Sequence, residues 1–217
     1  RNGEFAAAQR AYMQVVDSGV EDARLFYNLG NAHFKLQELG EAILWYERAH
    51  RLDPRDEDIA ANLLFANQVK TDRDEEKKEN AITQFVFSAF LFPTASELSL
   101  LFAAGWFGFF ALWVWRLLYR SAGGGFWLVA MLVCGSVAVM GGSWLALRSY
   151  QQANALSAIV LAASATARSG PDAGQTEVFS MHEGTKVNVV RSEGKWMLVR
   201  LQNGLGGWVP TEQIGVI

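Results

Sequence analysis

The side chains best suited to metal binding or nucleophilic catalysis are few and widely separated in this sequence. Three histidines stand at His33, His50 and His182, and none has a cysteine or carboxylate at the spacing of a metal site. The single cysteine, Cys134, lies inside an apolar run, where a thiol packs as a small hydrophobic group. The sequence therefore predicts no metal, no cofactor and no cysteine-dependent catalysis.

Two further patterns resemble catalytic motifs, but helix and turn chemistry explains them. The acidic residues between Asp53 and Asp58 fall where one expected helix ends and the next begins, and acids there stabilise the helix N-terminus. The glycine-rich segment SAGGGF at 121–126 lacks the lysine of a phosphate-binding loop. No serine lies in a nucleophile elbow motif. The sequence therefore indicates a protein that is not an enzyme.

The composition divides the chain into three parts. Of the 217 residues, 51% are hydrophobic and 19% charged, and between Glu97 and Arg148 the only charged residues are Arg116 and Arg120. The formal net charge of -3 provides no basic stripe that could neutralise phosphates, which argues against a nucleic-acid partner. We therefore expect two polar regions that flank an apolar middle.

The N-terminal part repeats itself with a period of 34 residues. The aligned pairs are Glu4 with Glu38, Ala8 with Ala42, Tyr12 with Tyr46, Asp22 with Asp56, Asn28 with Asn62, Leu29 with Leu63 and Ala32 with Ala66. The period is that of tetratricopeptide repeats, and the segment ARLFYNLGNAHFKLQELGEAILWYERAHRLDP resembles one complete repeat. We expect a tetratricopeptide region over residues 1–69. The first helix of its first repeat is absent from the sequence, so we expect the region to be truncated at its N-terminus.

The resemblance implies a concave surface formed mainly by the first helix of each pair. The residues that match the groove positions are Asn28, Asn31 and Lys35, with Asn62 one repeat later. Their carboxamides could hydrogen-bond an extended peptide of a partner protein. The alternative is that these residues are solvated or cap neighbouring helices.

Two segments connect the repeats to the apolar middle. Residues 70–80 are a charged run, KTDRDEEKKEN, which indicates a solvated linker or helix extension. Residues 81–93 carry apolar side chains at helical spacing, which favours an amphipathic helix in the membrane interface. The alternative for 81–93 is an extension of the next helix that bends at Pro93.

The middle part predicts two membrane-spanning helices, at 96–119 and 124–147. The 18 uncharged residues between Glu97 and Arg116 would span about 27 Å as a helix, and 27 uncharged residues follow Arg120. A soluble helical hairpin is the alternative, but it would need a larger surrounding core than the rest of the chain provides.

The short connection between the two spans determines the topology. It can only form a hairpin turn, so the regions before and after it must lie on the same side of the membrane. Arg116 and Arg120 favour a cytoplasmic position for this turn. Both polar regions are then expected outside the cytoplasm.

The last part, residues 158–217, alternates short apolar strands with turns. The run MHEGTKVNVVRSEGKWMLVRLQNGLGGWVPTEQIGVI resembles a bacterial SH3-like domain, a small all-β barrel that binds cell-wall or peptide ligands in many proteins. We expect Trp196 to pack in the core of the barrel and Trp208 to form a ligand platform. The alternative for Trp208 is that it packs in the core as well.

The combination of these parts is similar to the BatE-type proteins of the bacterial aerotolerance (Bat) group. Together they predict a multidomain membrane protein with an all-α repeat region, two transmembrane helices and an all-β barrel. The resemblance implies a periplasm-facing protein of the inner membrane, with protein partners that carry von Willebrand-type domains and a MoxR-type ATPase. We predict a membrane-anchored adaptor. The alternative is a peptidoglycan-binding or sensing protein that acts through the SH3-like domain.

Overall fold

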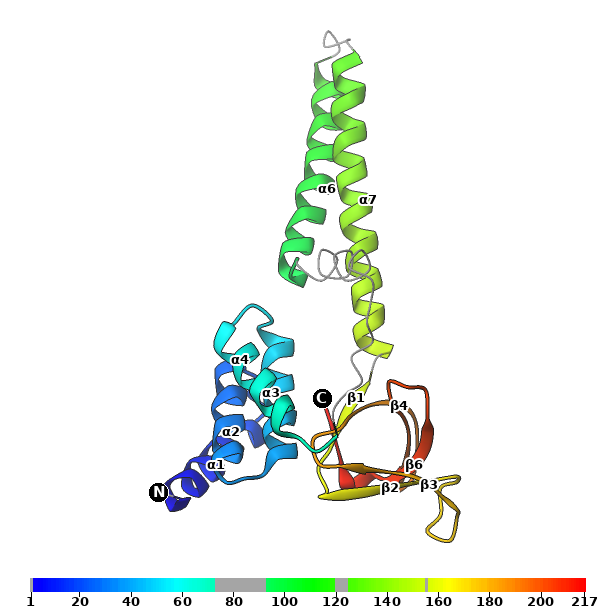
Figure 1. Cartoon of the computed structure of the whole chain (residues 1–217). Coiled ribbons are helices and arrows are strands. Elements are labelled where there is room, and N and C mark those ends of the chain that lie inside the picture. The colour runs from blue at the N-terminus through cyan, green and yellow to red at the C-terminus, as the bar shows by residue number, and fades with distance from the viewer. Residues whose placement is uncertain (1, 73–92, 120–124, 155) are drawn as a thin grey trace. The chain divides into compact units, whose positions relative to one another are not determined.

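The computed structural model describes residues 2–72, 93–119, 125–154 and 156–217 of the chain (Figure 1). These residues belong to two compact units. One unit contains the N-terminal helices and the C-terminal strands, and the other contains the two long helices. The predicted amphipathic helix at 81–93 and the charged linker fall almost entirely outside the described residues.

The N-terminal region consists of antiparallel helices. They are α1 (Asn2–Asp17), α2 (Ala23–Lys35), α3 (Leu39–Leu52) and α4 (Glu57–Val69). The side chains of Asp22 and Asp56 cap α2 and α4 by accepting hydrogen bonds from backbone amides of the first turn. Helices α2 and α3 approach closely at Gly30. A Cβ at this position would lie only 2.6 Å from the Tyr46 ring, so the approach depends on glycine. The expected helix pairs are therefore present.

A hydrophobic core holds these helices together. It consists of Phe26, Leu29, Trp45, Ala49 and Ile59, which come from α2, α3 and α4. Side chains of α1 such as Tyr12 and Val16 pack against this core.

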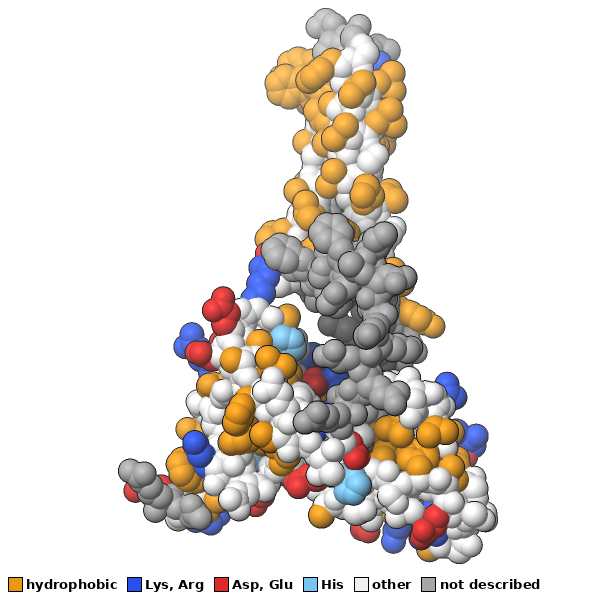
Figure 2. Space-filling view, in the orientation of Figure 1, with side chains coloured by type: hydrophobic (Ala, Val, Ile, Leu, Met, Phe, Trp, Pro, Cys, Tyr) orange, Lys and Arg blue, Asp and Glu red, His pale blue; other side chains and the backbone are white. Residues whose placement is uncertain are grey.

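The second unit is a pair of long apolar helices, α6 (Ala95–Leu118) and α7 (Gly125–Asn154). A capping box between Thr94 and Glu97 begins α6. Among the described residues, these two helices are long and apolar enough to cross a membrane, and only 11% of each apolar window is buried. Hydrophobic side chains are spread along the visible face of this pair in Figure 2.

The two long helices approach each other closely at Gly105. A Cβ on Gly105 would lie 2.6 Å from the backbone nitrogen of Ala138, so only glycine permits this approach. Arg116 lies in the last turn of α6, and the connection at 120–124 is outside the described residues.

The C-terminal region is an antiparallel sheet of seven strands that curls into a small barrel. In chain order the strands are β1 (Ser157–Val160), β2 (Ser164–Arg168), β3 (Glu177–His182), β4 (Lys186–Glu193), β5 (Trp196–Arg200), β6 (Gly206–Pro210) and β7 (Ile214–Val216), with a 3-10 turn, η1 (Thr211–Gln213), before β7. Their order in the sheet is β3-β2-β6-β5-β4-β1-β7. Its core contains small and aliphatic residues together with Met181.

Candidate functional site

The predicted groove residues of the repeats lie on α2 and α4. Asn28, Asn31 and Lys35 follow one another at helical spacing along α2, which Asp22 caps, and Asn62 lies on α4. Asn28 and Lys35 are exposed, whereas Asn31 and Asn62 are half-buried. The structure therefore separates these four residues into an exposed pair and a deeper pair.

The deeper pair forms a hydrogen-bond network between neighbouring helices. The Asn62 amide nitrogen donates to Asn31 Oδ1 at 2.9 Å and to the Tyr27 hydroxyl at 3.0 Å. The Tyr46 hydroxyl donates to the same Asn31 oxygen at 2.7 Å. Burial, together with the nearby Tyr27, raises the pKa of Tyr46 to about 12, so this phenol remains a neutral donor.

The network leaves hydrogen-bonding groups available to a ligand. Within the described residues, the Asn31 amide nitrogen and the Asn62 amide oxygen make no hydrogen bond. The first can donate and the second can accept, which are the two functions that a peptide backbone complements.

Two apolar residues that sequence reasoning missed continue this surface on α4. Phe65 and Val69 are 54% and 51% exposed. Phe65 and Val69 are the counterparts of Asn31 and Lys35 one repeat later. The centre of the Phe65 ring lies 5.7 Å from that of the Phe34 ring. The 34-residue shift that revealed the repeat could have identified both.

A second candidate surface is a groove of about 830 Å³ on the barrel. Its lining residues come from β2, the loop between β2 and β3, the turn between β4 and β5, the start of β5, and the end of β6 with η1: Ser164, Thr166, Arg168, Ala173, Gly194, Lys195, Trp196, Pro210, Thr211, Glu212 and Gln213. Trp196 lies opposite Pro210 in the pairing of β5 with β6, and both residues contribute apolar surface to the groove. The groove therefore combines an aromatic wall with polar and charged groups.

The polar groups of this groove include two that have no partner in the described part of the chain. Thr211 Oγ1 and Gln213 Oε1 are inaccessible to solvent and make no hydrogen bond. Arg168, by contrast, donates to the Gln175 carbonyl at 2.8 Å and pairs with Glu177 at 3.2 Å. These two atoms are closed to solvent, so a ligand in the groove does not reach them. The charged side chains open to a ligand are the exposed Lys195 and Glu212.

The structure corrects the expected place of Trp196. Side chains alternate along a strand, and in β5 it is Met197 and Val199 that pack with the core. Trp196 therefore lies on the outer face, half-buried, and lines the groove. The expectation that it packs in the core was wrong.

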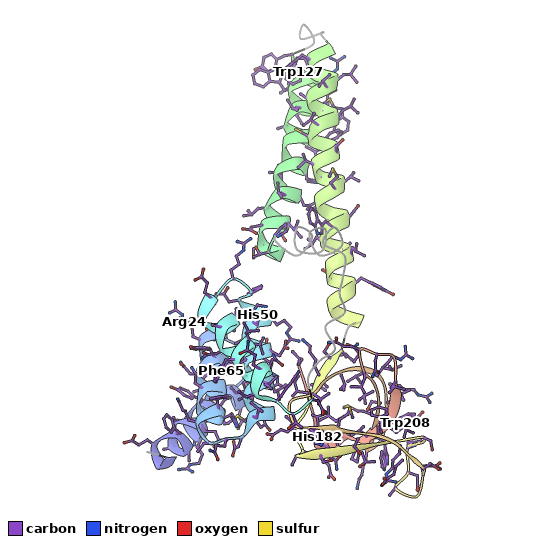
Figure 3. The ribbon with its side chains drawn as sticks, in the orientation of Figure 1. Arg24, His50, Phe65, Trp127, His182 and Trp208 are labelled. Atoms are coloured by element: carbon purple, nitrogen blue, oxygen red, sulfur yellow. The ribbon has the colours of Figure 1, made fainter. Side chains whose placement is uncertain are left out.

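Trp208, the predicted ligand platform, occupies a different place. It is half-buried on β6 between Leu198 of β5 and Arg168 of β2, and it does not line the groove. Figure 3 labels Trp208 on the side of the barrel away from His182. Its role as a platform stays a prediction.

Two of the histidines have carboxylate partners, which the sequence spacing did not indicate. His33 Nδ1 lies 2.7 Å from Glu38, and His182 Nδ1 lies 2.7 Å from Asp72. Each is a single pair, and no group of three potential metal ligands occurs in the part of the chain that the structure describes.

Comparison with known proteins agrees with these two modules. Residues 1–57 match the family model of the tetratricopeptide repeat, and residues 163–214 match that of the bacterial SH3 domain. No curated protein gives a significant match to the chain. Both families are typically non-catalytic interaction modules, and the chain joins them to two apolar helices that suggest membrane association.

Proposed function

We propose that the protein is a membrane-anchored adaptor that binds a partner protein through the surface of α2 and α4. The observation that carries this proposal is that amide groups of Asn31 and Asn62 without a hydrogen-bond partner share one surface with the exposed Phe65 and Val69. An extended peptide could hydrogen-bond the carboxamides through its backbone and place an apolar side chain against Phe65. Exposed Lys35 would favour an acidic group in the same peptide.

Site-specific photocrosslinking in native membranes tests this proposal. A photoreactive residue in place of Phe65 should capture a partner, and one in place of Asp17, which is exposed at the end of α1, should not. The additional substitution Lys35→Ala should weaken capture at Phe65, because it removes a positive charge from the surface. Equal capture at both positions, or none at Phe65, would contradict a specific surface on α4.

We further propose that this adaptor acts in an aerotolerance-type envelope complex. The order of repeats, two apolar helices and SH3-like barrel supports this, because BatE-type proteins share it. The expected partners carry von Willebrand-type domains, as other Bat-type proteins do, or belong to a MoxR-type ATPase system. Mass spectrometry of the proteins captured at Phe65 should recover proteins with von Willebrand-type domains, because an ATPase on the cytoplasmic side would not reach this residue. Recovery of unrelated proteins alone would refute the assignment.

We propose an inner-membrane location with both soluble regions in the periplasm. Arg116 and Arg120 support this orientation through the positive-inside bias. Compartment-specific reporters placed after Asn80, at Ser121 and after Ile217 should report outside, inside and outside. The reverse pattern would refute the orientation, and opposite sides for Asn80 and Ile217 would refute the two-span arrangement.

A second candidate function is peptidoglycan binding through the barrel groove, which the Trp196 wall and the exposed Lys195 and Glu212 favour. The detergent-solubilised full chain should then sediment with purified peptidoglycan. Trp196→Ala and Trp208→Ala form a matched pair for this assay. Loss of sedimentation in Trp196→Ala alone would assign the groove, and loss in Trp208→Ala alone would assign the predicted platform. Absence of sedimentation in the unaltered chain would contradict this function.

A further inference from the structure

Gly40, in the first turn of α3, occupies a position that the packing of the repeats does not explain. Close contact between α2 and α3 is provided by Gly30, and glycine is a poor helix former. A Cβ on Gly40 would lie 2.7 Å from the carbonyl oxygen of Val160 in β1 and 2.8 Å from Cγ of Glu183. The barrel, which belongs to the same compact unit, therefore requires glycine here.

Two glycines of the barrel make matching approaches to α3. A Cβ on Gly184 would lie 2.8 Å from Cδ1 of Ile43, and Gly184 has a φ of +85°, which disfavours other residues. A Cβ on Gly215 of β7 would clash with the Leu44 side chain. Glycines on both sides thus allow the two surfaces to fit closely.

The same contact has an apolar core. Ile159 of β1 is fully buried in one cluster with Ala42, Ile43 and Leu44 of α3 and Ala66 of α4. The barrel therefore contributes to the core of the α3 and α4 pair.

Polar contacts surround this core. Lys186 Nζ lies 2.8 Å from both carboxylate oxygens of Glu47, and the Gly40 backbone amide donates to Glu183 Oε1 at 2.7 Å. The guanidinium of Arg48 donates to the Val216 carbonyl at 2.6 Å. Most of these groups are partly buried, where such bonds are less screened by water than on an open surface.

Asp72, just after α4, adds a further contact between the repeats and the barrel. Its carboxylate accepts hydrogen bonds from the His182 backbone amide and from the Thr185 hydroxyl, both at 2.7 Å, and pairs with the His182 ring. Figure 3 shows His182 on the side of the barrel next to the helices. This carboxylate fixes the turn between β3 and β4 to the end of the repeat region.

We propose that the outer face of α3, formed by Gly40, Ile43, Leu44, Glu47 and Arg48, is a docking surface for the barrel of the same chain. The repeats and the barrel then act as one recognition module rather than as two tethered domains. On the barrel, the contact is made by β1, β7, the turn between β3 and β4, and Lys186 at the start of β4. None of these residues lines the groove. Docking therefore leaves the groove free and fixes it relative to the α2 and α4 surface.

Zero-length cross-linking of the full chain in detergent tests this proposal. Carbodiimide should join Lys186 to Glu47, because their side chains are in direct contact. Mixing chains with and without ¹⁵N label before the reaction distinguishes bonds within one chain from bonds between chains. We expect the cross-linked peptide pair within one chain.

Glycine variants supply the contrast. Gly40→Leu should lose most of the cross-link, and Gly3→Leu on α1, where a Cβ would meet nothing within 4 Å, should retain it. Gly215→Val alters the barrel side of the contact and should lose the cross-link as well. If Gly40→Leu unfolds α3, which would appear as a loss of helical circular dichroism, Gly215→Val still tests the proposal. Absence of the cross-link in the unaltered chain, a cross-link only between chains, or full yield in Gly215→Val would overturn the proposal.

Discussion

Alanine substitutions at Met181 and Trp196 should separate the core of the barrel from its groove. Met181 is 1% exposed within the core cluster, and truncation of such a side chain costs about 2–5 kcal/mol in the free energy of unfolding. Trp196 is half-buried on the outer face, so Trp196→Ala widens an open groove instead of leaving a cavity. We expect it to cost about 1 kcal/mol, as a typical single substitution does.

Amide hydrogen exchange of the full chain in detergent measures this difference in the strands of the barrel. The exchange rate of the protected amides rises tenfold for each loss of about 1.4 kcal/mol in the free energy of unfolding. Met181→Ala should therefore accelerate exchange roughly 30-fold to several-thousand-fold, and Trp196→Ala by less than about tenfold. Leu205→Ala, at a side chain that is 50% exposed, serves as the control and should change little. Equal acceleration in Trp196→Ala and Met181→Ala would refute the assignment of Trp196 to the groove.

Two further substitutions test contacts elsewhere in the chain. Burial acts to raise the pKa of Asp72, but hydrogen bonds from the His182 backbone and from a threonine hydroxyl outweigh it and lower that pKa below its usual value. The ionised Asp72 carboxylate stabilises the folded chain at pH values above the pKa that Asp72 has in the unfolded chain. This stabilisation is lost as the pH falls through the lower pKa that Asp72 has in the folded chain. Below about pH 4 the unaltered chain should therefore lose stability more steeply than Asp72→Asn. Unfolding measured over this range checks it, and parallel curves would contradict it. In the long helices, a Cβ on Gly108 lies 4.0 Å from the Cβ of Cys134, which suits a disulfide. Gly108→Cys should therefore oxidise with Cys134, whereas Phe107→Cys, at a position 71% exposed, should keep two thiols that alkylation and mass measurement can count. Complete alkylation of Gly108→Cys would refute the packing of α6 on α7.

The helical and strand elements could be predicted from the sequence because their signals are local. The 34-residue period located the repeat helices, and Asp22, Asp56 and Pro54 mark helix ends through capping and through the missing proline amide. Runs of uncharged residues located α6 and α7, which the structure shows as continuous helices.

The state of the candidate groove residues could not be predicted in the same way. Spacing placed Asn31 and Asn62 on one surface, but their mutual hydrogen bond depends on the distance between α2 and α4. The face of β5 that points inward depends on how the sheet curls, and this decided that Trp196 lines the groove. Such outcomes follow from packing between elements, which a local pattern does not encode.

The sequence by itself determined the modules, their order and the apolar helices between them, because period, capping and hydropathy are properties of neighbouring residues. Only the tertiary structure decided what Gly40 does. Its amide bonds to Glu183, 143 residues away along the chain, and its missing side chain makes room for β1. The residues around a glycine in a helix do not indicate which distant segment packs against it. The contact between repeats and barrel therefore forms only when both are folded and packed together.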